Sequence, residues 1–220
     1  MVHVYYHILA IDGVESIIDE QLSLIEKHFD FPYILNIGIS IENINISTSK
    51  ILEKFTKPNH KIRDIRAQGN EFVTLDVLEE DKEKFDDSDY ILYIHTKGAS
   101  RQTDNNYKNI ISWRHLMNYF NIERVKNVFK LFEKTQFNTY GVLLVKQSFY
   151  MGNFWWMRSD YAKTITDKNI AGHKSNRYLA EGGYLSNGIN WTPYSAYNNE
   201  IVIETDNPYI FEFKREEYGK

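Results

Sequence analysis

The sequence contains no cysteine, only four prolines and no excess of positive charge. Without cysteine there is neither a disulfide scaffold nor a thiolate metal site. The net charge of −4 and the pI near 6 argue against nucleic-acid binding, because such binding needs a basic surface to displace counterions from phosphate. The expected partners therefore include no nucleic acid.

Long apolar runs and targeting signals are also missing. Nowhere do 18 apolar residues follow one another, and the first residues lack the basic-then-apolar pattern of a signal peptide. We therefore expect no membrane span. A cytoplasmic location follows by default, which would be the host cytoplasm for a viral protein.

Proline-rich, Gly-rich and Ser-rich stretches are absent too, so no linker is visible, and residues 1–220 fit one large domain. Aromatic residues are abundant instead, at 15% of the chain. Such rings fill hydrophobic cores, but sugar sites use them as well, so composition leaves both uses open. The charged ending at Lys220 fits either a natural terminus or a cut in a longer multidomain chain.

Alternating β-rich and helical patterns predict an α/β fold, with a mixed, mainly parallel central sheet flanked by helices. The continuous apolar run 90–94 indicates a strand buried on both faces. Strands are predicted at 3–9, 33–39, 61–67, 90–94, 140–145 and 154–158. Helices are predicted at 14–28, 51–55, 71–84, 110–132 (in one or two pieces), 159–168 and 175–184. A polar, mobile loop is expected at 99–108, and the last forty residues lean towards β structure.

The sharpest functional signal follows the strand 90–94, which ends abruptly in His95-Thr96-Lys97-Gly98. In open α/β sheets, ligands bind outside the carboxyl ends of the strands. Lys97 offers a charge for a phosphate, and Gly98 lets the backbone approach closely. His95 can donate to a phosphate oxygen or ligate a metal, and Thr96 offers a hydroxyl and an amide. The alternative is an ordinary polar loop.

A second candidate segment contains Gly152, Asn153, Trp155 and Trp156. Neighbouring residues of a strand point to opposite faces, so one tryptophan should be core. The other could stack on a sugar or a base, although both could be structural. Asn153 could hydrogen-bond a hydroxyl.

Two further candidates lie on predicted helices. Glu181 precedes a Gly-Gly pair and is either a general base or an ordinary surface glutamate. Trp113 and Arg114 either contact an acceptor or a phosphate, or are a core tryptophan beside a surface arginine.

Asp87-Ser88-Asp89 matches the Asp-x-Asp metal signature of many sugar transferases. That motif must lie at the carboxyl end of its strand to reach a diphosphate. Here it precedes the strand 90–94 and therefore belongs to the opposite edge of the sheet. We interpret it as a solvated turn.

Taken together, these segments resemble a group of glycosyltransferase-like proteins of the GT-A fold, found in bacterial polysaccharide loci and in large algal viruses. The opening, with Asp12 after the first strand, is especially similar to the virus-encoded amino-terminal transferase domain. The likeness spans about residues 2 to 190, and the order and spacing of its segments carry it. These segments are 4–7, 12–15, 66–75, 90–100, 113–114, 152–156 and 177–181.

The resemblance implies a GT-A fold, a nucleoside-diphosphate sugar donor, most simply UDP-linked, and usually Mn²⁺ or Mg²⁺. By this resemblance, the nucleoside is held by the first strand end, from His7 to Asp12, and by the turn containing Arg66 and Gln68. The segment 95–98 occupies the place where such enzymes normally have Asp-x-Asp, and it faces the diphosphate.

The same resemblance places the sugar and the glycan acceptor against Gly152, Asn153, Trp155 and Trp156, with Trp113 and Arg114 as further contacts. Glu181 falls near the catalytic or acceptor-contacting acid of inverting relatives. It would be the base if the reaction inverts at the anomeric carbon.

One departure from the family pattern concerns the metal. With His-Thr-Lys in place of Asp-x-Asp, Lys97 could itself balance the diphosphate charge, or His95 and an acid from elsewhere could hold a cation. The expected function is glycosyl transfer to a carbohydrate hydroxyl. The alternatives are a non-catalytic carbohydrate- or nucleotide-binding module and, less well supported, a nucleotidyltransferase, whose Gly-rich basic loop is missing.

Overall fold

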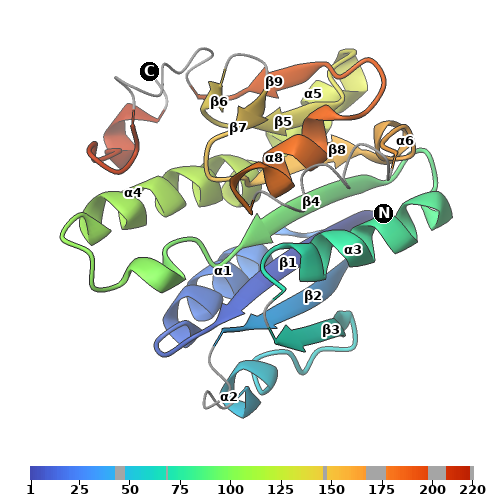
Figure 1. The fold of residues 1–220 in the computed structure, drawn as a ribbon. Coiled ribbons are helices and arrows are strands. Elements are labelled where there is room, and N and C mark those ends of the chain that lie inside the picture. The colour runs from blue at the N-terminus through green and yellow to red at the C-terminus, as the bar shows by residue number, and fades with distance from the viewer. Residues whose placement is uncertain (43–47, 68, 146–147, 167–176, 198–206, 219–220) are drawn as a thin grey trace.

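A seven-stranded sheet with helices on both faces organises the protein, which confirms the predicted mixed, mainly parallel α/β architecture (Figure 1). The computed structural model describes residues 1–42, 48–67, 69–145, 148–166, 177–197 and 207–218. The strands follow one another across the sheet as β3 (His60–Ala67), β2 (Tyr33–Ile41), β1 (Val2–Ala10), β4 (Tyr90–His95), β8 (Trp155–Arg158), β5 (Thr139–Gly141) and β9 (Pro193–Ser195).

The first four strands of this order are parallel. Strand β8 runs antiparallel to both β4 and β5, and β9 is parallel to β5. A separate two-stranded ribbon pairs β6 (Leu144–Val145) with β7 (Phe149–Tyr150). Leu143 has a positive φ of 57°, and the predicted strand 140–145 is divided there between two sheets.

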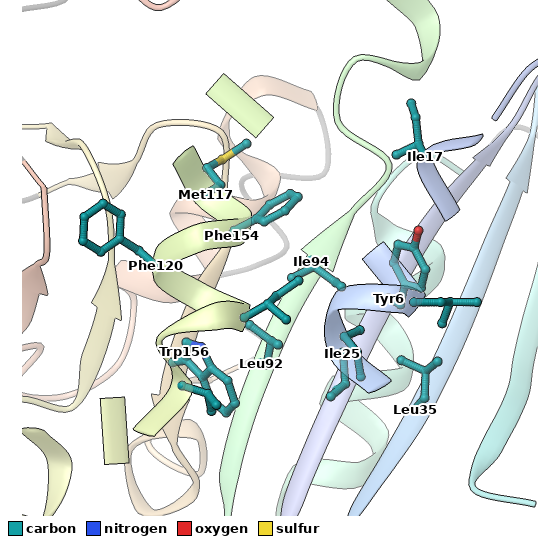
Figure 2. Close-up of a cluster of buried hydrophobic side chains, with 14 of the residues drawn as sticks. Tyr6, Ile17, Ile25, Leu35, Leu92, Ile94, Met117, Phe120, Phe154 and Trp156 are labelled. Atoms are coloured by element: carbon teal, nitrogen blue, oxygen red, sulfur yellow. The ribbon is translucent and has the colours of Figure 1, made fainter. Parts of the chain in front are cut away.

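Side chains of a strand alternate between its faces, so each strand supplies two cores. On one face, Val4, Tyr6 and Ile8 of β1 pack under α1 (Glu15–His28), α4 (Tyr107–Asn118) and α5 (Val125–Lys134). Figure 2 shows this cluster, with the aliphatic side chains of β4 facing those of α1 and α4. Tyr5 points to the other face, beneath α3 (Phe72–Asp81), α6 (Ser159–Ala162) and α8 (Arg177–Ser186).

The predicted helix 110–132 is present in two pieces, α4 and α5. They are joined by one turn of π-helix, η3 (Tyr119–Glu123). The carbonyl of Asn121 in this widened turn accepts a hydrogen bond from the Trp156 indole at 2.8 Å. A tryptophan of the sheet thus anchors the junction of the two helices.

Other predicted boundaries differ from the structure. The segment 99–108 contains a 3₁₀ turn, η2 (Ala99–Arg101), and the start of α4. The predicted helix 159–168 ends at Ala162. The remaining short elements are α2 (Ser49–Leu52), η1 (Lys82–Lys84) and η4 (Arg215–Glu217). Among the described residues, no helix has both the length and the apolar character needed to cross a membrane.

Candidate active site at the ends of β1 and β4

A cavity opens where β1, β2 and β4 end, at the edge of the sheet that the sequence indicated. The chain passes from β1 to β2 and β3 on one side and then returns to β4 on the other side of β1. Such a switch point leaves a crevice outside the strand ends, which is where open α/β sheets bind ligands. Among the predicted site residues, His7, Asn153, Glu181 and all of His95–Gly98 line this cavity.

His7 and His95 line the cavity side by side. They are register partners on the parallel strands β1 and β4. Both nitrogens of the buried His7 ring contact hydroxyl groups, those of Thr74 at 3.1 Å and of Ser40 at 3.3 Å. Thr96 is buried and accepts a hydrogen bond from the backbone of Leu9. This bond joins the turn after β4 to β1.

An acidic cluster forms one wall of the cavity. Ligand atoms of Glu71, His95 and Glu181 all lie within 4.8 Å of one another. Nε2 of His95 lies 2.8 Å from the Gly152 carbonyl, which can only accept a hydrogen bond, so Nε2 carries the proton. The other ring nitrogen, Nδ1, faces the carboxylate and lies 4.0 Å from Oε1 of Glu181.

Glu181 is held in place from two sides. Glu181 is only 5% exposed, although the sequence left open that it is a surface residue of the helix α8. Tyr93 donates to Oε1 at 2.8 Å, and Asn153 donates to Oε2 at 2.7 Å. Burial raises the pKa of the Tyr93 hydroxyl well above its usual value, and the charges of Glu181 and Glu71 raise it further. Tyr93 thus remains a donor. The interpretation of Glu181 as a surface glutamate is wrong.

The opposite wall is basic. Lys97 lines the cavity, and its Nζ lies 4.0 Å from the ring centroid of Trp113. Gly98 has a positive φ of 87°, and a Cβ there would lie 2.7 Å from Cγ2 of Ile110. Glycine is therefore required for this turn. Arg101 also lines the cavity on this side.

Trp113 is the core tryptophan of the second alternative, but Arg114 is not at the surface. Both are buried, and neither lines the cavity. Arg114 forms two hydrogen bonds with Glu20, at 2.9 and 3.1 Å, and donates a third to the Lys97 carbonyl at 3.0 Å. It is neither an acceptor contact nor a surface arginine. It holds the turn from beneath.

Trp155 and Trp156 point to opposite faces as predicted, but both are completely buried. Trp155 stacks on Tyr93, with ring centroids 4.9 Å apart. Neither ring can stack on a sugar here, because helices cover both faces of the sheet. Gly152 is buried too, and its contribution is the carbonyl that orients His95.

Two predicted nucleoside contacts lie away from the cavity. Asp12 is exposed, and its carbonyl accepts a hydrogen bond from Gln102. Arg66 pairs with Asp64 at 2.5 Å and with Asp76 at 2.6 Å. Neither residue lines the cavity. Gln68 lies outside the described residues.

The Asp-x-Asp triplet lies at the opposite edge, as predicted. Asp87 and Ser88 are exposed, which fits a solvated turn. Asp89 does not fit this interpretation as a solvated turn. It is 5% exposed and lies 3.0 Å from Nε2 of His3.

Sequence reasoning missed Glu71, Tyr93 and Tyr209 as site residues. Glu71 precedes the first residue of α3 and follows the end of β3, so the strand-end rule could have found it. Tyr93 could have been found by its spacing, since residues two apart on a strand share a face. No local signal marks Tyr209, which lines the cavity from the distant C-terminal segment.

Fold and site together define an α/β protein with a switch-point cleft that has one acidic and one basic wall. The chain belongs to the family "Domain of unknown function (DUF8361)", whose model matches residues 3–196. No curated protein matches it.

Proposed function

We propose that this protein is a GT-A glycosyltransferase that moves a sugar from a nucleoside-diphosphate sugar, most simply UDP-linked, to a carbohydrate hydroxyl. The carrying observation is the cleft itself. It places a carboxylate–imidazole cluster, Glu71, His95 and Glu181, across from Lys97 at the switch point of the sheet. A diphosphate leaving group can use both walls, because the acidic one can hold a divalent cation and the basic one can pair with a phosphate oxygen.

The acidic cluster fits a divalent cation by its donor chemistry. Carboxylate oxygens suit both Mn²⁺ and Mg²⁺, whereas an imidazole ligand favours a transition metal, so Mn²⁺ fits this cluster better than Mg²⁺. The hydrogen bond from His95 Nε2 to the Gly152 carbonyl is the outer contact that typically orients a ligating histidine. When bound, the ion would neutralise charge on the diphosphate.

The chain's own groups would divide the remaining work. Lys97 would stabilise the charge that develops on the leaving group, with the backbone amides near Gly98. Glu181 is fixed by Tyr93 and Asn153 beside His95, and this supports a role in holding the cation rather than as a mobile base. Asn153 lines the cavity, which supports the predicted contact with a sugar hydroxyl, but its Oδ1 atom is buried in the structure as it stands.

Titration of the full chain with UDP by calorimetry, with and without Mn²⁺, tests this proposal. Micromolar binding that requires Mn²⁺ is expected. Equal UDP affinity with and without Mn²⁺ would indicate that Lys97 and the 95–98 turn bind the diphosphate alone. No binding in either condition would overturn the UDP-linked donor. Binding without slow hydrolysis of a UDP-sugar in the presence of Mn²⁺ would favour a non-catalytic binding module.

A further inference from the structure

Behind the turn His95–Gly98, on the face of the sheet opposite the acidic cluster, lies a network of polar side chains in which Gln21, Arg114 and Asn118 are buried and Glu20 is partly exposed. Glu20 of α1 is its centre. It accepts two hydrogen bonds from Arg114 and one from Asn118 at 2.7 Å. The neighbouring Gln21 donates to the carbonyl of His95 at 3.1 Å. Polar groups in such a place cost free energy unless they bond one another, and these do.

One face of α4 carries the contacts to the turn. Ile110, Trp113 and Arg114 are spaced i, i+3 and i+4, and so project from the same side of the helix. Ile110 is the nearest side chain to the position where Gly98 would carry a Cβ. Trp113 lies beneath the Lys97 ammonium group, and Arg114 bonds the Lys97 carbonyl. These three residues of α4 thus contact Gly98, the Lys97 side chain and the Lys97 backbone in turn.

We infer that Arg114 and Glu20 are positioning residues for this site: they fix the Lys97 carbonyl from behind and so direct the Lys97 ammonium group into the cavity. Neither is catalytic, because neither lines the cavity. Glu20 keeps the Arg114 fork in place by a bidentate pair, the geometry that a guanidinium makes and an ammonium cannot. Their effect on turnover rests on the proposed function, whereas their effect on the turn does not.

The test compares Arg114→Lys with Arg158→Lys in the full chain. Arg158 is a matched control because its guanidinium makes the same set of bonds far from the site. Two go to Asp160, at 2.9 and 3.1 Å, and one to the Phe132 carbonyl at 3.2 Å. Lysine keeps the charge in each variant but loses the fork.

Hydrogen–deuterium exchange of the peptide 95–101 is the first measurement, since the amides of Lys97, Ala99 and Arg101 are hydrogen-bonded within this turn. In Arg114→Lys we expect these amides to exchange about tenfold faster, because a charge-assisted hydrogen bond is lost. Exchange across β4 should stay at the wild-type rate, and Arg158→Lys should leave 95–101 unchanged. Equal exchange in wild type and Arg114→Lys, or equal acceleration in both variants, would overturn the inference.

Turnover of a UDP-sugar separates positioning from stability. We expect Arg114→Lys to lower kcat about tenfold with KM nearly unchanged. If Arg114→Lys does not fold, the isosteric Glu20→Gln replaces it with the same expectations. A wild-type kcat in the folded variant would also overturn the inference. If Arg114→Lys shows faster exchange in 95–101 but the wild-type chain shows no turnover, the positioning role of Arg114 and Glu20 is supported and the proposed function is rejected.

Discussion

The two ends of the β1–β4 pair contain similar residues but different structures. At the start of the strands, His3 meets Asp89, and at their end His95 meets Glu181. Asp89 and Glu181 are both 5% exposed, so burial does not distinguish them. The difference lies in what surrounds each pair.

At the starting end, the polar groups are packed directly on one another. Asp89 accepts a hydrogen bond from the backbone N–H of Asp86 and contacts the ring of His3, which packs on Phe85 with ring centroids 4.4 Å apart. At the other end, α3 and α8 bring Glu71 and Glu181 to the rim of a cavity. A buried histidine–acid pair thus indicates a candidate site only where the fold also leaves room for a ligand.

The strongest test of this difference between the two ends removes one carboxylate charge at each of them. Glu181→Gln should weaken both Mn²⁺ binding and turnover about 100-fold, because a neutral amide replaces a charged carboxylate ligand. Asp89→Asn should instead cost about 2 kcal/mol of unfolding free energy, since a buried charged acceptor is lost. Paramagnetic resonance of bound Mn²⁺ and urea unfolding measure the two effects. If Glu181→Gln only lowers stability, the two ends are equivalent and the site is structural.

Lys97 offers a test of the basic wall. Lys97→Ala should lower turnover at least about tenfold, because the negative charge on the leaving group loses a positively charged partner. Lys126→Ala is the control, since Lys126 only pairs with Asp30 on the surface, at 2.6 Å. Circular dichroism should show both variants folded. Normal turnover in Lys97→Ala would remove this residue from the mechanism.

The smallest effect concerns acid stability beneath the site. Burial tends to raise the pKa of Glu20, but hydrogen bonds from His115 and Arg114 and their positive charges outweigh it and lower the pKa to about 2. Glu20 therefore contributes stability that is fully present above its ordinary pKa of 4.5 and is lost as pH falls towards 2. The melting-temperature gap between wild type and Glu20→Gln should narrow between pH 5 and pH 2. A constant gap would contradict the paired charge.

Local pattern predicted much of this framework because strand and helix periodicities are local. The apolar run of β4 was correctly taken as a buried strand, and the 95–98 turn was correctly placed at its carboxyl end. Trp155 and Trp156 show where such reasoning stops. Their alternation was predicted, but periodicity cannot reveal that helices cover both faces, and so the proposed sugar stacking was wrong.

Arg114 illustrates the same limit from the other side. Its sequence neighbours suggested either a ligand contact or a surface position, whereas its partner Glu20 is 94 residues away on another helix. Only the packing of α1 against α4 brings the two charges together. A buried arginine cannot be recognised until its counter-ion is known.

By itself, the sequence determined the order of strands and helices, the absence of a basic surface and the chemistry available after β4, because these depend on residue type and short spacing. The tertiary structure alone decided which of those groups meet. Glu71, His95 and Glu181 come from three elements separated by up to 110 residues, and long-range packing sets their distances. It also decided that Trp113 and Arg114 support the turn rather than contact a ligand, because burial is a property of the assembled layers.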